Sequence, residues 1–294
     1  MGGSITTTMM LSRNYPPSPE LAPYVARHYV FEADLPEDFT LIDSLLSETA
    51  FIRILIRGDW KAEIAPGYWA SAGPVVFFGP NGFPLPVQVK GPFTVAGFAI
   101  HPGGWRSLFD RSARDYADQM MPLSAAWGDI ADRLWAEAEA AGDDTALVAA
   151  MEHAITAQLN RIGLRQPDAQ MAAFAKIARI DSIIRIDDAA AQIGLSVRQL
   201  ERRCLATFGL SPKAVLRRSR FLDMATAMRG FSSPSDEELA ALRYFDQSHL
   251  TREFKRFAGM TPRAFQRAVT PLLTAGLNLR SQAKANLADD QERE

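Results

Sequence analysis

In the C-terminal third of the chain, apolar residues recur at the spacing of short amphipathic helices. One such series repeats every four residues, at Leu200, Cys204 and Phe208. Ser196 stands just before this series and is a suitable N-cap, because its hydroxyl can accept from the free amides of the first turn. The residues upstream of it, 187–193, are also helical in pattern and end at Gly194. The spacing therefore predicts two short helices joined by a tight turn.

The same arrangement returns about 50 residues later, which indicates an internal repeat. The apolar side of the second copy is formed by Leu250, Phe254 and Phe257. Each copy ends at a glycine, a common helix stop, and a Ser-Pro or Thr-Pro pair then begins the next helix. These junctions are Gly209-Leu210-Ser211-Pro212 and Gly259-Met260-Thr261-Pro262. The helix predicted from Pro212 to Arg229 is long enough to space the copies by one DNA turn, roughly 34 Å.

The polar sides of both helices carry residues that can read DNA. Arginine forks onto guanine and glutamine onto adenine when a helix lies in the major groove. Charge supports this interpretation, since residues 185–267 hold 15 Lys and Arg against 9 Asp and Glu, whereas the remainder holds 17 against 25. A basic region joined to an acidic one is what phosphate binding by one end of the chain requires.

These residues resemble the paired signature of AraC/XylS-type bacterial transcription regulators. The resemblance covers roughly residues 185–268 and rests on Gly194 to Arg203 in the first copy, and on Asp246-Gln247-Ser248-His249 through Gly259-Met260-Thr261-Pro262 in the second. The chain departs from the family pattern at Arg243-Tyr244-Phe245, where the family usually has a glycine in the second turn. The helix before it, Asp236 to Leu242, is one residue short, which predicts less regular docking of the second copy.

The resemblance and the exposed faces together select candidate DNA contacts. The candidates for reading bases are Arg198, Gln199, Glu201, Arg202, Gln247, Ser248, Thr251 and Arg252. The candidates for contacting phosphates are Arg203, Lys213, Arg217, Arg218, Arg220, Lys255, Arg256 and Arg263. Double-stranded DNA is the expected partner.

Residues 40–101 follow a β-strand rhythm, with short apolar stretches separated by Gly and Pro. The predicted strands are 51–57, closed by a Gly58-Asp59 turn, then 61–64, 75–79, 86–89 and 93–100. After His101-Pro102-Gly103-Gly104 the pattern becomes helical, at 124–141, 143–163 and 169–180. This half is similar to the cupin-like sensor domain of one AraC-type subgroup. The expected fold class is α+β: an N-terminal β-barrel or sandwich with flanking helices, then an all-α tandem helix-turn-helix domain.

The chain is accordingly divided into a sensor or dimerisation domain, a linker helix and the DNA-binding domain, between two disordered tails. The ranges are 1–14 for the first tail, 15–165, 166–184, 185–268, and 269–294 for the second tail. If the barrel encloses a pocket, its strands would select an apolar or aromatic effector. The candidate pocket residues are Arg53, Trp60, Trp69, Phe78, Phe98 and His101. Arg53 and Arg57 share one strand face, and we expect that face to meet solvent.

Composition argues against a metal enzyme. The chain has four histidines, of which only His28 and His101 fall near the barrel, and a single cysteine, Cys204, whose slot is core-facing. We expect no catalytic metal, no cofactor and no membrane segment, and a cytoplasmic location. RNA polymerase and a second copy of the chain are further partners that the resemblance implies. Two alternatives stay open: a small-molecule-binding protein or enzyme of the barrel, and a regulator that acts by protein contact with a degenerate DNA module.

Overall fold

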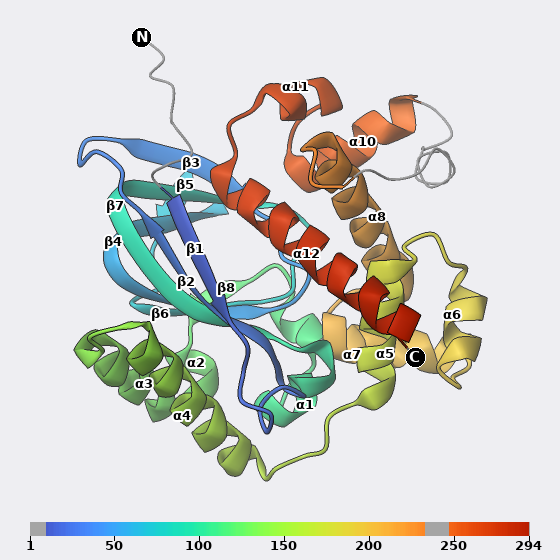
Figure 1. Ribbon diagram of the computed structural model, residues 1–294, viewed down its shortest axis with the longest axis horizontal. Coiled ribbons are helices and arrows are strands. Elements are labelled where there is room, and N and C mark those ends of the chain that lie inside the picture. The colour runs from blue at the N-terminus through green and yellow to red at the C-terminus, as the bar shows by residue number, and fades with distance from the viewer. Residues whose placement is uncertain (1–9, 233–246, 294) are drawn as a thin grey trace.

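The computed structural model describes residues 10–232 and 247–293 of the chain. It confirms the α+β class: an antiparallel sheet with flanking helices forms the N-terminal half, and a helical domain follows (Figure 1). The strands are β1 (Met10–Tyr15), β2 (Val25–Ala33), β3 (Thr40–Leu45), β4 (Phe51–Ala65), β5 (Tyr68–Ala70), β6 (Val75–Phe78), β7 (Leu85–Ile100) and β8 (Met120–Pro122).

The sheet is built around two long strands, β4 and β7, which pair with each other along most of their length. Its order is β1-β2-β7-β4-β6-β8, with β3 added to β7 and β5 added to β4. Among the described residues, the end strands β1 and β8 do not pair with each other, so one curved sheet takes the place of a hydrogen-bonded closed barrel.

The predicted turn at Gly58-Asp59 is wrong, because β4 continues through it. Irregular register on both sides of Arg57 bends the strand there instead of reversing it. Gly58 has φ +100°, and a Cβ on it would lie 2.7 Å from the Cβ of Phe93. The glycine therefore permits a close approach of β7. In the same way β7 runs without a break through the segment expected to separate 86–89 from 93–100.

Each face of the sheet carries its own core. Alternation along β7 sends Ala96, Phe98 and Ile100 to one face, where α3 (Asp129–Ala140) and α4 (Asp144–Ile162) cover them. The other face gathers Phe51, Trp60, Phe78 and Phe93 inside the curve. We call this second face the inner face of the sheet.

Short helical elements join the sheet to the layer formed by α3 and α4. They are η2 (Pro102–Gly104), α1 (Trp105–Leu108), η3 (Ala113–Tyr116) and α2 (Ser124–Trp127). The helix expected over 124–141 is divided between α2 and α3 because Gly128 has φ +59°. The helix expected over 143–163 is confirmed as α4, with Asp143 as its N-cap and Gly163 as its left-handed C-cap.

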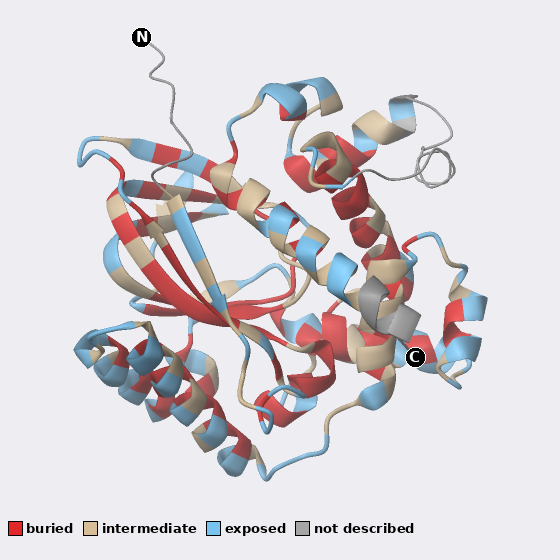
Figure 2. Cartoon of the chain, in the orientation of Figure 1, coloured by how far each residue is buried: buried red, intermediate tan, exposed pale blue. Residues whose placement is uncertain are grey.

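The second half of the chain is helical. Its elements are α5 (Ala169–Ile180), α6 (Ile186–Gln192), α7 (Val197–Phe208), α8 (Pro212–Met228), α10 (Gln247–Ala258), α11 (Pro262–Arg267) and α12 (Pro271–Arg293). Helix α5 agrees with the expected linker helix. Helix α8 is largely buried, as the red bands along it in Figure 2 show. No described helix is long and apolar enough to cross a membrane.

The disordered tail expected at 269–294 is wrong, because α12 occupies it. Leu272 is buried against the inner face of the sheet, while Leu273 and Leu277 pack against the aromatic residues of α8 and α10. Asp43 on β3 accepts hydrogen bonds from the backbone amides of Leu272 (2.7 Å) and Leu273 (3.4 Å), and so caps the start of this helix. The expectation of disorder over 1–14 also fails at residues 10–14, which lie in β1.

Candidate nucleic-acid interface

The first helix-turn-helix unit consists of α6 and α7, joined at Gly194 with φ +68°. Ser196 caps α7 as predicted, and the cap is reciprocal: Ser196 accepts from the Gln199 amide, and the Gln199 side chain accepts from the Ser196 amide at 2.8 Å. Leu200, Cys204 and Phe208 are buried along its inner side. Burial raises the pKa of the Cys204 thiol, which fits a packing role.

The junction that follows α7 is repeated after α10: in each case a glycine and a Ser-Pro or Thr-Pro pair lead into the next helix, α8 or α11. Gly209 and Gly259, which follow the two recognition helices, both have left-handed backbones, with φ of +66° and +69°. Ser211 and Thr261 then accept from the amides of Ala214 and Ala264, the third residues of the next helices. The predicted repeat of helix, glycine and Ser/Thr-Pro is confirmed. The departure at Arg243, and the helix expected over Asp236 to Leu242, lie outside the described residues.

The candidates for reading bases fall into three groups. Arg198, Glu201, Arg202 and Arg252 are exposed. Ser248 is exposed and Thr251 half-buried, and each of them has an interaction within the protein. Gln199 serves the cap of α7, so its carbonyl oxygen is already occupied, and the side chain of Gln247 lies outside what the structure describes.

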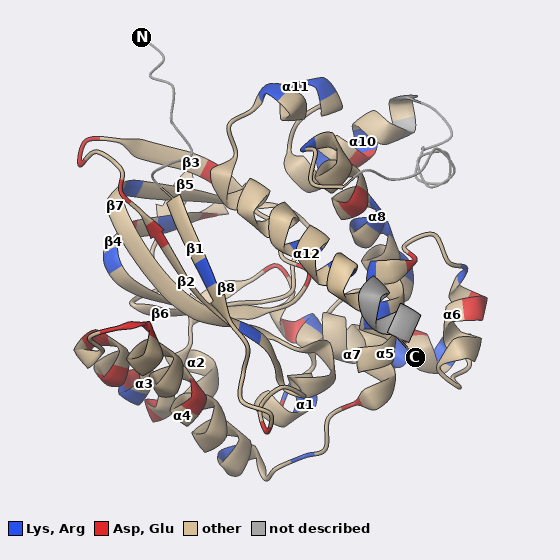
Figure 3. Cartoon of the chain, in the orientation of Figure 1, with Lys and Arg blue, Asp and Glu red and all other residues tan. Residues whose placement is uncertain are grey.

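Among the candidates for phosphate contact, Lys213, Lys255 and Arg263 are exposed. Arg217 forms an ion pair with Glu253, whose side chain is completely buried. Arg256 is half-buried, with its guanidinium 4.5 Å from the centre of the Phe83 ring. Figure 3 shows the basic residues as blue bands on α8, α10 and α11.

Three other candidates are occupied by the protein itself. Arg203 is paired with Asp168, 2.5 Å away, and also donates to Gln170. Arg218 is 3% exposed and donates to the backbone oxygens of Asn81 and Glu48. Arg220 donates to the backbone oxygen of Ser182 at 3.1 Å. In this conformation each of these three side chains is engaged in a contact within the protein.

Arg218 belongs to a buried charge network that the sequence did not reveal. Glu48, in the loop after β3, accepts from Arg179 of α5 (3.2 Å) and from Arg280 of α12. Arg280 also reaches Asp223 of α8 at 2.7 Å. Burial would raise the pKa of Glu48, but the guanidinium groups of Arg280, Arg179 and Arg218 outweigh it and lower the pKa to about 2. The network joins the N-terminal domain to three helices of the C-terminal half.

The effector candidates do not all converge. Arg53 points to the inner face of the sheet, where its guanidinium lies 4.2 Å from the Trp60 ring centre and 5.4 Å from that of Phe78. Arg57 is exposed, because the irregular register between Leu55 and Arg57 turns its side chain away from the face that Arg53 occupies. The expectation that Arg53 meets solvent is therefore wrong.

Phe98 lies on the opposite face of the sheet from Arg53 and packs against Trp127 at 5.9 Å between ring centres. Trp69 is half-buried on β5. His101 stands at the end of β7, where its Nδ1 accepts from the Gly103 amide. Among the described residues, no group of three or more His, Cys, Asp or Glu could hold a metal ion.

Comparison with known proteins identifies two domains. Residues 189–268 match the model of a helix-turn-helix domain, and residues 13–122 match a domain of unknown function, DUF6597. Curated proteins gave no match.

Three solved structures illustrate the similarity to known folds. They are ToxT from Vibrio cholerae (TM-score 0.46, 10% identity, 88% of this chain and 98% of that chain), ToxT from V. cholerae strain SCE256 bound to unsaturated fatty acid (0.44, 12%, 91% and 98%), and the AraC-like transcriptional activator CuxR (0.25, 13%, 74% and 86%).

The conclusion rests on the domain match together with the geometry above. Helices α7 and α10 lie inside the matched segment, and each is followed by a left-handed glycine and by a Ser-Pro or Thr-Pro pair that caps the next helix. The chain therefore carries an AraC-type helix-turn-helix domain at residues 189–268, joined to an N-terminal DUF6597 domain, and is a DNA-binding transcription regulator.

Proposed function

We propose that α7 and α10 enter consecutive major grooves on one side of a DNA duplex and read its sequence there. The observation that carries this proposal is the exposure of Arg202 and Arg252 on two helices that the chain builds in the same way. Helix α8 stands between the units; its 17 residues give it a length of about 25 Å, which is shorter than the roughly 34 Å of one DNA turn, so the junctions at its ends must supply the rest of the spacing. Arg198 and Glu201 flank Arg202 on the free side of α7 and complete its reading surface.

Exposed basic residues around the two helices supply the non-specific part of the affinity. Lys213, Lys255 and Arg263 are the candidates that the fold leaves available. Each phosphate neutralised by such a residue releases counterions, so binding weakens as salt rises. These contacts hold the protein in register, and the arginines that reach base edges select the sequence.

The decisive experiment selects preferred duplexes from a randomised pool and then compares Arg202→Ala with Arg252→Ala on them. Each variant should lose about 1–3 kcal/mol of discrimination at one base pair, and the two affected positions should lie about 10 bp apart. Arg133→Ala, an exposed arginine on α3, is the matched control and should bind as the unchanged protein does. Equal losses on every sequence would show that both arginines contact phosphates, and the base-reading proposal would then fail.

We also propose that the inner face of the sheet binds a small aromatic or apolar effector that carries an anionic group. Arg53 supports this, because its Nε and Nη1 atoms are buried without a hydrogen-bond partner, next to the rings of Phe51, Trp60 and Phe78. A buried donor without an acceptor costs about 1–3 kcal/mol, which an accepting ligand would recover. The rings would hold an apolar body beside that anion.

Aromatic carboxylates such as benzoate and naphthoate are suitable probes for this site. They should raise the Tm of the protein, with no such rise for Arg53→Leu. Arg57→Leu, the exposed arginine on the same strand, should keep the response. An equal response from all three proteins would place the ligand elsewhere and exclude Arg53.

A further inference from the structure

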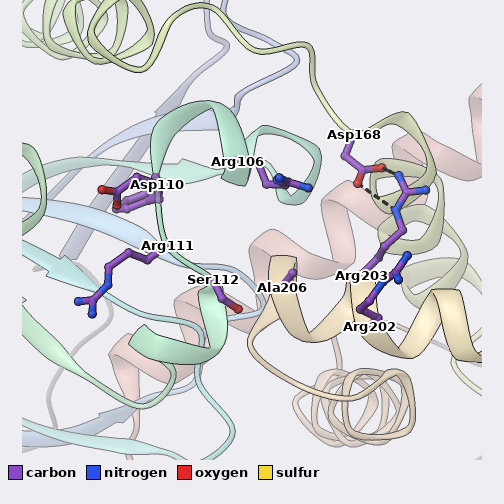
Figure 4. Close-up of a pocket in the computed structure, with 9 residues that line it drawn as sticks. Arg106, Asp110, Arg111, Ser112, Asp168, Arg202, Arg203 and Ala206 are labelled. Carbon is purple, nitrogen blue, oxygen red and sulfur yellow. Dashed lines mark hydrogen bonds and ion pairs between the residues drawn. The ribbon is translucent and has the colours of Figure 1, made fainter.

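A basic cleft lies where the N-terminal domain meets the first recognition helix. It has a volume of about 570 Å³, and its walls are the segment from α1 to η3 on one side and α7 on the other. The charged residues that line it are Arg106, Asp110, Arg111, Asp168, Arg202 and Arg203. In Figure 4 the side chain of Arg106 extends from α1 toward α7, which carries Arg202 and Arg203.

The two walls are fixed to each other at the far end of α7. Ser112, the N-cap of η3, donates to the backbone oxygen of Leu205 at 3.5 Å. Gly209 fits so closely against η3 that a Cβ on it would lie 2.8 Å from the backbone oxygen of Ala113. The C-terminal half of α7 is therefore attached to the N-terminal domain, while the half that carries Arg198 and Arg202 is exposed.

The positive charge of this cleft is only partly neutralised within the protein. Arg203 has its counterion in Asp168. In the part of the chain that the structure describes, the exposed side chains of Arg106 and Arg202 have no recorded hydrogen bond or ion pair. Asp110 and Arg111 point away from the three arginines (Figure 4). Two arginines, one on each wall of an open cleft, thus have no acid of their own, an arrangement that favours an anion.

The position of Arg202 indicates which anion fits. Besides this cleft, it borders a second hollow formed by Ser196, Arg198 and Gln199, on the part of α7 that faces the bases. The cleft is therefore continuous with the reading surface. A helix in the major groove has a sugar-phosphate backbone on each side of it, and Arg recognises phosphate oxygens with its planar fork.

We propose that Arg106, from the N-terminal domain, contacts a DNA phosphate beside the groove that α7 enters. The inference rests on the proposed function, and it extends the DNA interface beyond the helix-turn-helix domain. The N-terminal domain then contributes directly to affinity, and it fixes its own orientation relative to the duplex.

The test measures duplex binding by the full chain at several salt concentrations, with Arg106→Ala, Arg106→Lys and the control Arg57→Ala. Arg57 is also an exposed arginine of the N-terminal domain, so the change in net charge is the same. Arg106→Ala should weaken binding by about 3- to 10-fold near 0.15 M salt and reduce the slope of log K against log salt by about 0.9. The loss should be equal for preferred and unrelated duplexes. Arg106→Lys should retain most of the affinity, and Arg57→Ala should match the unchanged protein.

Ethylation interference separates a phosphate contact from an indirect effect. One phosphate whose ethylation blocks the unchanged protein should no longer do so for Arg106→Ala. Unchanged affinity and slope for Arg106→Ala would overturn the proposal, as would a loss confined to one sequence. If Arg106→Ala weakens the binding of inorganic phosphate but leaves DNA binding normal, the cleft is a site for a small anion. That result would also overturn the proposal.

The proposed function fails separately, since it requires sequence preference in the unchanged protein. A protein that binds all duplexes equally but loses one phosphate in Arg106→Ala would contradict base reading and support the Arg106 contact.

Discussion

The two helix-turn-helix units are built alike but attached differently. The first is in direct contact with the N-terminal domain, because Gly209 and Leu205 at the end of α7 pack on η3. The second shares its aromatic core with α12, through Leu273 and Leu277, and its own contact with the N-terminal domain includes the exposed ring of Phe83 beside Arg256. Helix α12 in turn rests on the sheet through Leu272.

This difference means that the N-terminal domain can influence each unit by a separate route. A change near η3 acts directly on the orientation of α7. A change near β3 acts on α10 through α12. Substitutions in the buried network and along each route can therefore separate these contributions.

The largest effect is expected for Glu48→Gln, which breaks the buried network that joins the N-terminal domain to α5 and α12. The substitution keeps the shape but removes the carboxylate that pairs with Arg179 and leaves Arg280 with Asp223 alone. Because the Glu48 side chain is 24% exposed, we expect a loss of roughly 3 kcal/mol in the free energy of unfolding, at the lower end for a broken buried pair. Urea denaturation measures it, with the exposed Glu20→Gln as the control.

The dependence of stability on pH is a second test of the Glu48 carboxylate. Its folded pKa of about 2 lies below the ordinary value of 4.5, so its contribution is complete above pH 4.5 and is lost as the pH falls toward 2. The Glu48→Gln variant should therefore approach the stability of the unchanged protein in that window. Equal stability of the two proteins at neutral pH would contradict the role of Glu48 in joining the halves.

Gly209→Ala disrupts the direct route alone, and Gly259→Ala is its matched control. Both glycines have left-handed backbones, so both substitutions carry about 1–2 kcal/mol of strain. Only Gly209 also has a neighbour in the way, the Ala113 oxygen at 2.8 Å, whereas nothing lies within 4 Å of a Cβ on Gly259. We expect Gly209→Ala to lose about 1 kcal/mol more in thermal or urea unfolding. Similar losses would mean that η3 yields easily and does not hold α7.

The α12 route has a pH-dependent element at Asp43. Burial raises the pKa of this carboxyl to about 6 from 3.8, although the amides of Ser44, Leu272 and Leu273 donate to it. Since the folded pKa is the higher one, the folded state binds the proton more tightly, and this group lowers stability as the pH rises from about 4 to 6.

Asp43→Asn removes that titration and retains an oxygen that can accept from the α12 amides. Relative to the unchanged protein, the variant should gain about 2 kcal/mol between pH 4 and pH 7, because each pKa unit corresponds to about 1.4 kcal/mol. Urea denaturation at four pH values in this range measures the difference. If the free energy of unfolding changes with pH in the same way for both proteins, Asp43 is not the source of the pH dependence.

The sequence predicted what local patterns determine and missed what distant partners determine. Ser196, Gly209, Ser211, Gly259 and Thr261 act within a few residues of themselves, so their caps and turns were predicted correctly. The reciprocal cap of α7 also shows the limit of such reasoning. A glutamine such as Gln199 can bind adenine or cap a helix N-terminus, and the sequence alone does not distinguish the two roles.

Helix α12 was missed because its stability depends on residues more than 200 positions away. Its cap is Asp43, and its apolar residues Leu272, Leu273 and Leu277 are followed by a polar stretch that alone gives no helical signal. The phosphate candidates rest on predicted helix faces and on the family resemblance, and neither reveals partners from the other half of the chain. Whether Arg218 or Arg106 meets an acid, a carbonyl or solvent is decided by tertiary contacts.

The smallest effect is expected at Phe83, where the second unit touches the N-terminal domain directly. Its ring is 48% exposed and lies 4.5 Å from the Arg256 guanidinium, so the contact contributes about 0.5–1 kcal/mol. Phe83→Ala should therefore change the Tm little. Because Arg256 is then released to reach a phosphate, DNA binding should tighten about 2- to 5-fold and its salt slope should steepen by up to about 0.9. Phe83→Tyr keeps an aromatic face and should bind as the unchanged protein does. Weaker binding by Phe83→Ala would instead mean that the ring holds Arg256 in position for DNA, so that the direct contact would support the second unit rather than restrain it.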